Sequence, residues 1–134
     1  MRRFFEYLSL VFAAGVIGGL ANSLALWGFG QAGITTSLSV KLTPALTPAW
    51  LYPRLVWGGI WGLMFLLPFW RQRPFSKGVL LSLGPTLVQL LVVFPSQHKG
   101  MYGLALGQLT PLFVVFFNAV WGVIAAIWLR ICRT

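Results

Sequence analysis

Acidic side chains are almost absent from this chain of 134 residues, which holds a single aspartate or glutamate, Glu6. Mechanisms that need paired carboxylates, an aspartate-oriented histidine or a carboxylate shell around a metal ion are therefore excluded. One cysteine, Cys132, and one histidine, His98, are too few for an internal disulfide or a zinc site. We therefore expect no enzymatic activity, no bound metal and no cofactor.

Charged residues of either sign make up only 8% of the chain, whereas hydrophobic residues make up 58% and the mean hydropathy is +0.85. This composition excludes a water-soluble globule, because soluble domains are about 45–50% apolar. A membrane helix needs roughly 20 apolar residues. The chain has four such runs, so we predict an all-α polytopic membrane protein with one transmembrane domain over residues 1–134. The runs are Phe5–Phe29, Arg54–Trp70, Lys77–Phe94 and Thr110–Ile131.

The basic residues are distributed unequally between the two sides of these predicted spans. One side carries Lys41, Arg54 and Lys99, and the other carries Arg2, Arg3, Arg71, Arg73, Lys77, Arg130 and Arg133. Cytoplasmic loops carry the excess of Lys and Arg, so both termini are predicted to be cytoplasmic, in a bacterial inner membrane. The net charge of +9 is dispersed at helix ends without an aromatic platform. It predicts contact with anionic lipid head groups and no binding of nucleic acid.

The chain also contains a weak internal repeat. A shift of 63 residues aligns two pairs of segments, and a shift of 64 aligns a third. The aligned pairs are Gly15–Ile17 with Gly78–Leu80, Leu46–Pro48 with Leu109–Pro111, and Val56–Gly58 with Val120–Gly122. The pattern predicts two copies of a helical hairpin, over about 5–70 and 75–131. Because each copy has two spans, the copies point the same way and form a parallel repeat.

Prolines set the expected helix boundaries. Thr110 and Pro111 form a cap followed by a proline in the first turn, which predicts that the fourth helix begins at Thr110. Pro53 should interrupt a helix that begins at Thr47, so a separate turn is expected over Thr47–Tyr52. Pro85 lies in the middle of the third span and should kink it.

Small residues recur at four-residue spacing in every predicted span, and such stripes allow membrane helices to approach closely. We expect them to pack the helices of one chain together, with a dimer interface as the alternative. The stripes are Gly15, Gly19 and Ser23; Gly58 and Gly62; Gly78, Ser82 and Thr86; and Asn118, Gly122 and Ala126.

Six polar residues lie inside the spans, and intramembrane polar groups are often functional. At a rise of about 1.5 Å per residue, three of them reach a similar depth in the outer third. Asn22, Gln89 and Asn118 are therefore predicted to form one cluster. One interpretation is an outward-facing polar vestibule or ligand site, and the other is amides that fix the helix register by bonding one another. The six are Asn22, Ser23, Ser82, Thr86, Gln89 and Asn118.

Part of this pattern resembles a known family. The carrying segments are Lys77 to Gln89, Val93 to Pro95, Leu109 to Pro111 and Asn118 to Gly122. They are similar to uncharacterised bacterial inner-membrane proteins of the YagU-like kind. The resemblance implies a four-helix inner-membrane protein and carries no chemical signature.

Two functions are compatible with these features. The first is a non-catalytic membrane scaffold, either a homo-oligomer or an accessory subunit of a larger membrane complex, because little of the chain lies outside the predicted spans. The alternative is a passive channel or facilitator for a small neutral or anionic solute, which the polar layer and the lack of negative charge favour.

Overall fold

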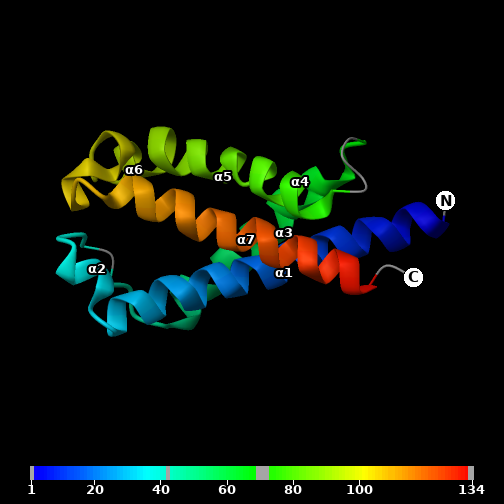
Figure 1. The fold of residues 1–134 in the computed structure, drawn as a ribbon, viewed down its shortest axis with the longest axis horizontal. Helices are drawn as coiled ribbons and strands as arrows, with labels where there is room; N and C mark the ends of the chain where they lie inside the picture. Colours follow the sequence, from blue (N-terminus) through cyan, green and yellow to red (C-terminus); the bar gives the residue numbers. More distant parts are fainter. Residues whose placement is uncertain (1, 42, 69–72, 133–134) are drawn as a thin grey trace.

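The computed structural model describes residues 2–41, 43–68 and 73–132, and all regular structure within these ranges is helical (Figure 1). Three residues used in the sequence predictions lie outside the described residues: Trp70, the end of the second predicted span, and Arg71 and Arg133, which were counted among the basic residues. The elements are α1 (Arg2–Gln31), α2 (Ile34–Ser37), α3 (Pro48–Gly62), the 3-10 turn η1 (Leu63–Leu66), α4 (Pro74–Leu81), α5 (Leu83–Val88), the π-helical segment η2 (Gln89–Val93), α6 (Phe94–Ser96), the 3-10 segment η3 (Met101–Leu106) and α7 (Thr110–Cys132).

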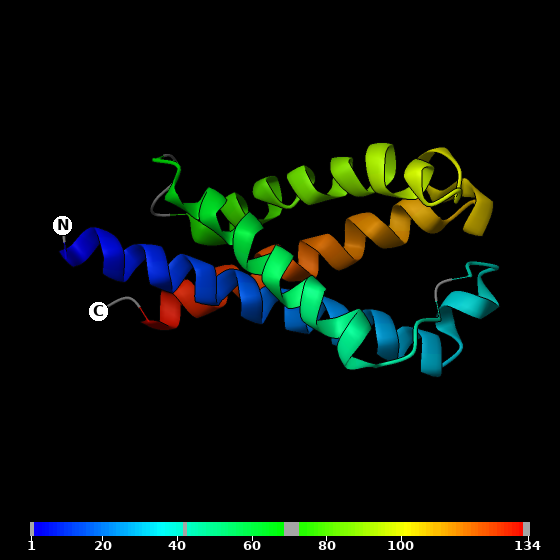
Figure 2. The same cartoon turned by 180° about the vertical axis from the view of Figure 1, so that it is seen from behind.

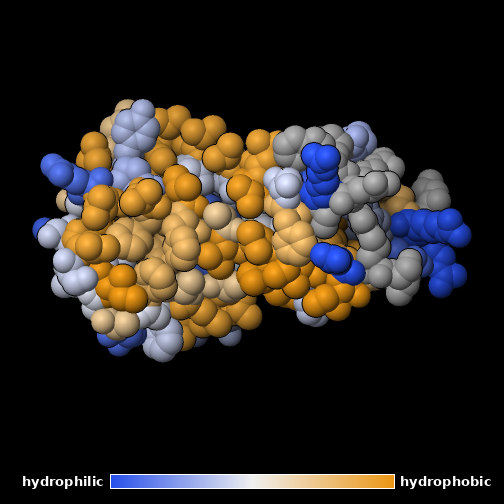
Figure 3. Space-filling view, in the orientation of Figure 1, coloured by the Kyte–Doolittle hydropathy of each residue, from blue (hydrophilic) through white to orange (hydrophobic). Residues whose placement is uncertain are grey.

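Within the residues that the structure describes, three helical stretches are long and apolar enough to cross a membrane: α1, Phe75–Ser96 and α7. The start of α1 and the end of α7 lie at one end of the molecule, here named the terminal end, and α2 and α6 lie at the opposite end, named the loop end (Figures 1 and 2). Apolar side chains cover the middle of the face in Figure 3, and hydrophilic side chains gather mainly near the two ends. This distribution agrees with the length and apolar character of the three stretches.

The helix boundaries follow local capping chemistry. The prediction that a helix begins at Thr110 is confirmed by α7. At α3, Thr47 is the cap: its hydroxyl oxygen accepts a hydrogen bond from the Trp50 amide at 3.2 Å, and Pro48 occupies the first helical position.

The expected break at Pro53 is wrong, because α3 runs through this proline without interruption. Proline removes the bond that its amide would donate to the carbonyl four residues earlier, here Ala49. Ala49 lies in the first turn of α3 and is exposed, so this carbonyl can tilt outward to water or head groups. The second long apolar segment therefore begins at Pro48 and not at Arg54.

The helical path from Pro74 to Ser96 is interrupted at Ser82, one turn before Pro85, where the sequence predicts a kink. Two hydroxyls bond the local backbone there: Ser82 Oγ donates to the Val79 carbonyl at 2.6 Å, and Thr86 Oγ1 donates to the Ser82 carbonyl at 2.7 Å. Pro85 leaves the carbonyl of Leu81 without a helical donor, and these two bonds are made to carbonyls on either side of it.

Glycines bring α1 and α3 into backbone contact. A Cβ added at Gly15 would collide with the Gly58 carbonyl oxygen and lie 2.8 Å from the Cα of Gly62. A Cβ at Gly19 would lie 3.1 Å from the carbonyl oxygen of Arg54. The small-residue faces of these two helices therefore pack against each other within one chain.

A second glycine contact joins α4 to α7. A Cβ at either Gly78 or Gly122 would collide with the carbonyl oxygen of the other glycine. A Cβ at Gly78 would also lie 3.4 Å from the Cβ of Ala126. Between α1 and α7, Gly18 lies against the backbone and ring of Trp121. A Cβ added at Gly18 would lie 2.9 Å from Cδ1 of Trp121. Gly18 belongs to none of the predicted stripes, so sequence reasoning missed this contact.

Toward the terminal end, the helices close around an apolar core. Its buried members include Val11, Phe65 and Trp121. Lys77 is also buried there, and its Nζ donates to the carbonyl oxygens of Phe65 at 3.0 Å and Leu67 at 2.5 Å. These carbonyls lie at the end of η1, where helical partners run out, so Lys77 caps that terminus.

Candidate functional site

Arg54 lies on α3, about 10 Å along the helix from the Thr47 cap. Its side chain points toward α1. Its Nε donates to Ser23 Oγ at 2.9 Å, and its Nη2 donates to Asn22 Oδ1 at 2.6 Å. The guanidinium also stacks on Trp50, with Cζ 4.7 Å from the ring centroid. A partly buried cation is thereby held between α1 and α3.

The bonds continue from Asn22 across the bundle. Asn22 Nδ2 donates to the Phe117 carbonyl at 2.7 Å and to Asn118 Oδ1 at 3.2 Å. Asn118 Nδ2 then donates to Thr86 Oγ1 at 3.0 Å. Each donor points away from Arg54, so the bonds polarise one another in one direction. This polar network ties α3, α1, α7 and α5 together at one depth.

Four of the six predicted polar residues take part in this network: Asn22, Ser23, Thr86 and Asn118. Ser82 joins it only through its backbone carbonyl, because its hydroxyl bonds its own helix. Within the described part of the chain Gln89 makes no side-chain hydrogen bond, although it lies beside Asn118 in the wall of two cavities.

Sequence reasoning missed Arg54, which it placed at the outer end of a span. A signal for it exists. Arg54 lies four residues before Gly58 and eight before Gly62, so it extends the small stripe of α3 by one turn. Asn118 precedes Gly122 and Ala126 in the same way, and it was recognised.

A cavity of about 500 Å³ opens above the polar network toward the loop end. Its charged lining residues are all basic: Lys41, Arg54 and Lys99. Amides of Asn22, Gln89, Gln97 and Asn118 and the hydroxyl of Thr43 complete its polar lining. The cavity therefore offers positive charge and hydrogen-bond donors, and no negatively charged group.

A second cavity, of about 450 Å³, adjoins the first and shares six of its lining residues, which are Asn22, Arg54, Gln89, Val93, Gln97 and Asn118. Its other walls are mostly apolar and come from both flanks of the bundle. They include Pro53, Trp57 and Trp61 of α3 and Pro85 and Val88 of α5. We call the two cavities together the cleft.

One wall of the cleft contains the π-helical segment η2. Gln89 begins η2 and Val93 ends it, and both line the two cavities, as does Gln97 one turn later. π-helical turns are rare and occur frequently at functional sites. The π-helical segment therefore lines the same two cavities as Arg54.

The cleft is closed toward the terminal end by Trp121, which is buried. Its Nε1 donates to the carbonyl oxygens of Gly15 at 3.1 Å and of Gly58 at 3.3 Å. The glycine contacts of α1 with α3 and of α4 with α7 lie in the same region. Trp121 therefore forms the floor of the cleft, and the loop residues Lys41, Thr43 and Lys99 line the part of it nearest the loop end.

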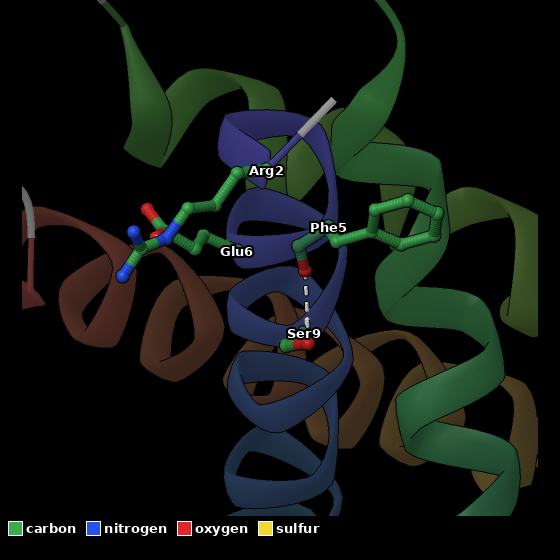
Figure 4. A network of polar contacts seen from close by, with 4 residues as sticks. All are labelled: Arg2, Phe5, Glu6 and Ser9. Carbon is green, nitrogen blue, oxygen red and sulfur yellow. Dashed lines mark hydrogen bonds and ion pairs between the residues drawn. The ribbon is translucent and has the colours of Figure 1, made fainter.

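Arg54 has no carboxylate side chain near it. The one acidic residue, Glu6, lies about 24 Å away along α1 from Asn22, near the terminal end. There it accepts a hydrogen bond from Arg2 Nε at 3.2 Å, one turn earlier in the same helix (Figure 4). Ser9 donates to the Phe5 carbonyl on the neighbouring turn.

The described residues contain no group of three or more His, Cys, Asp or Glu side chains able to hold a metal ion. Cys132 is a free thiol, exposed at the end of α7. The chemistry of the cleft is therefore that of cations, amides and hydroxyls. No protein family, characterised protein or solved structure was found to match this chain.

Proposed function

We propose that this chain is a non-catalytic, four-span membrane protein that binds an anionic group in the cleft around Arg54. The observation that carries this proposal is the charge of Arg54, which faces the cleft in a chain with no aspartate and with its one glutamate at the opposite end. Even a partly buried charge carries a desolvation cost when no counter-charge lies near it. An anion supplied from outside is the natural partner.

The chemistry of the cleft favours an oxyanion. Arg54 uses Nε and Nη2 for Ser23 and Asn22, so further N–H groups of its planar fork remain for a ligand. This fork matches carboxylate and phosphate oxygens. Gln89 adds an amide without a side-chain partner among the described residues, and Lys41 and Lys99 at the mouth raise the local concentration of anions.

Four spans are proposed because α3 and η1 together supply a fourth crossing. Their 19 residues, from Pro48 to Leu66, cover roughly 30 Å, which is the thickness of the hydrocarbon core. The start of α1 and the end of α7 share one end of the molecule, as an even number of crossings requires (Figure 1). The charge asymmetry supports a bacterial inner membrane with the terminal end in the cytoplasm and the loop end outside.

Matched contacts support an origin in two copies of a hairpin. Gly15 meets Gly58 in the first hairpin, and Gly78 meets Gly122 in the second. The bond from Arg54 to Ser23 likewise corresponds to the bond from Asn118 to Thr86. In both cases the first-helix residues are 63 apart and the second-helix residues 64 apart. The proposed repeat thus places the cation in one copy and an amide in the other.

Binding is favoured over free passage. A channel would need a continuous path, and here Trp121 and the glycine contacts close the floor of the cleft. The scaffold function remains the competing proposal, with a homo-oligomer or a larger membrane complex as its partner. A scaffold has no reason to respond to anions, so an anion response separates the two proposals.

The test uses the full chain in nanodiscs of zwitterionic phosphatidylcholine. The apparent unfolding temperature is measured in sodium phosphate, sulfate and acetate, against sodium chloride at equal ionic strength, because chloride is not an oxyanion. A ligand that binds only the folded state raises this temperature as its concentration exceeds the dissociation constant. We expect such a rise for the native chain and for Arg3→Gln, which removes an exposed charge at the terminal end. Arg54→Gln should abolish it, and equal responses of the two variants would contradict the proposal.

A further inference from the structure

The two cavities of the cleft have different walls. The one nearer the loop end is lined by Lys41, Thr43 and Lys99, which lie in or beside the loops. The other is lined by apolar side chains of two helices, Trp57 and Trp61 on α3 and Val88 on α5. Arg54 belongs to both walls, so one charged group is in reach of a polar chamber and of an apolar one.

The apolar chamber reaches the membrane-facing surface. Trp57 is 59% exposed and Val88 is 37% exposed, although both line the cavity. In the proposed four-span topology both residues lie on membrane-crossing helices, so their exposed surface faces lipid chains. The chamber therefore has a lateral mouth into the hydrocarbon, between α3 and α5.

This gap has a defined lower edge. A Cβ added at Gly84 of α5 would lie 3.2 Å from the Trp61 ring and 3.4 Å from the Met64 side chain, so the helices touch there. Closer to the loop end, α3 makes no extensive contact with α5 or η2 among the described residues, whereas α1 packs along α7. The flank between α3 and α5 is therefore in contact at Gly84, and the cavity lined by Trp57 and Val88 lies on the side of this contact nearer the loop end.

We infer that the bound anion is the head group of an amphiphile, with its apolar chain leaving through the gap between α3 and α5. This inference rests on the proposed function and names its ligand class: a phosphate or carboxylate group attached to a hydrocarbon chain. The head group contacts Arg54, Gln89 and Gln97. The chain passes between Trp57 and Val88.

Physical arguments favour this ligand over a free ion. Pockets of about 300–1,000 Å³ hold molecules of many atoms, so a cleft of two cavities near 500 and 450 Å³ is large for a bare oxyanion. An amphiphile is confined to the membrane, which raises its effective concentration at a lateral mouth. Its chain can stay in hydrocarbon while only its head group enters the polar chamber.

The test compares three additives in nanodiscs of zwitterionic phosphatidylcholine: dodecyl phosphate, inorganic phosphate and dodecyl maltoside. Dodecyl maltoside has the same chain without the charge. We expect dodecyl phosphate to raise the unfolding temperature at concentrations where the other two have little effect. Arg54→Gln should abolish this rise.

Two tryptophan substitutions on α5 test the gap itself. Val88→Trp fills the lateral mouth, whereas Leu87→Trp adds the same group one residue earlier, where the side chain is 55% exposed and lines neither cavity. The apparent affinity for dodecyl phosphate should be at least about tenfold weaker in Val88→Trp than in Leu87→Trp. An unchanged response to inorganic phosphate at high concentration shows that the Arg54 site in Val88→Trp is intact.

The outcomes distinguish the proposed anion site from the inference that its ligand is an amphiphile. Equal effects of dodecyl phosphate and inorganic phosphate, or equal responses of the two tryptophan variants, overturn the amphiphile and leave the anion site standing. No response to either phosphate overturns both. If Val88→Trp does not fold, the lipids that copurify with the native chain and with Arg54→Gln are compared by mass spectrometry, and equal amounts of anionic lipid overturn the inference.

Discussion

Arg54 Nη2 lies 2.6 Å from Asn22 Oδ1, and this contact joins α3 to α1 at the base of the cleft. Because the oxygen of Asn22 accepts from Arg54, its NH2 group faces α7, where it donates to the carbonyl of Phe117 and to Asn118. The cation therefore orients the amide that fixes the neighbouring helix. The charge that makes the cleft a candidate binding site is also part of what holds the helices in register.

The bond between Asn118 and Thr86 is expected to stabilise the fold. Thr86→Val keeps the shape of the side chain and removes the acceptor of Asn118 Nδ2. We expect Asn118→Leu and Thr86→Val each to reduce the free energy of unfolding by about 0.6 to 2 kcal/mol. The double variant should lose less than the sum of the two, since both remove the same bond. Strict additivity in a double-mutant cycle would show that the bond does not contribute.

The glycine contact between α4 and α7 predicts that the effect of a glycine-to-alanine substitution on stability depends strongly on its position. Gly122→Ala places a methyl group against the backbone of Gly78, and we expect it to lower the free energy of unfolding by about 1–3 kcal/mol. Gly28→Ala is the matched control, because nothing lies within 4 Å of its added Cβ. There alanine should be neutral or stabilising by up to about 1 kcal/mol, through its higher helix propensity. Equal changes at both positions, measured by thermal unfolding, would contradict the assigned contact.

The two tryptophans that the proposed repeat aligns, Trp57 and Trp121, should differ in importance for stability. Trp121→Phe keeps an aromatic ring in the core and removes the N–H that bonds the carbonyls of Gly15 and Gly58, so a loss of about 1 kcal/mol is expected. Trp57 is 59% exposed, and Trp57→Phe should change the stability by less than about 0.5 kcal/mol. Thermal unfolding of both variants in the same nanodiscs compares them directly, and a larger effect at Trp57 would refute the assignment of Trp121 to the floor.

Much of the fold could be predicted because the relevant signals are local. Thr110 and Pro111 give the start of α7, since a cap and a first-turn proline act on their own helix. The glycines recur every four residues and so lie on one helix face whatever their partner is. The polar residues of the membrane segments come together because few other groups there can satisfy them.

Other features depend on contacts that a sequence does not display. The effect of Pro53 is set by where the carbonyl of Ala49 lies, and this carbonyl is at an exposed helix end. Once α3 is known to begin at Pro48, the spacing to Gly58 turns Arg54 toward α1. The π-turn of η2 and the fit of Gly18 against Trp121 come from packing between distant segments. These tertiary features are the ones that shape the cleft.

The orientation can be tested with the native thiol. Cys132 is exposed at the end of α7, and the charge asymmetry predicts that this end is cytoplasmic. A membrane-impermeant maleimide should therefore label Cys132 in inverted vesicles and not in intact cells. Ser96→Cys in a Cys132→Ser background places a thiol at the loop end, where Ser96 is exposed, and should show the opposite pattern. Labelling of Cys132 in intact cells would reverse the proposed topology.

The proposed repeat predicts that the cation can be moved from one hairpin to the other. Asn118 is the counterpart of Arg54, it also lines both cavities, and its partner Thr86 is the counterpart of Ser23. Arg54→Asn alone should abolish stabilisation by oxyanions. Addition of Asn118→Arg returns a guanidinium to the cleft from α7, and Thr86 is placed to accept its Nε–H as Ser23 accepts that of Arg54. We therefore expect the double variant to regain part of the oxyanion-dependent rise in unfolding temperature, at a cost in basal stability because Asn22 loses Asn118 Oδ1. A double variant that folds in nanodiscs and ignores oxyanions would show that binding depends on the position of Arg54 on α3, and that the two halves of the cleft are not equivalent.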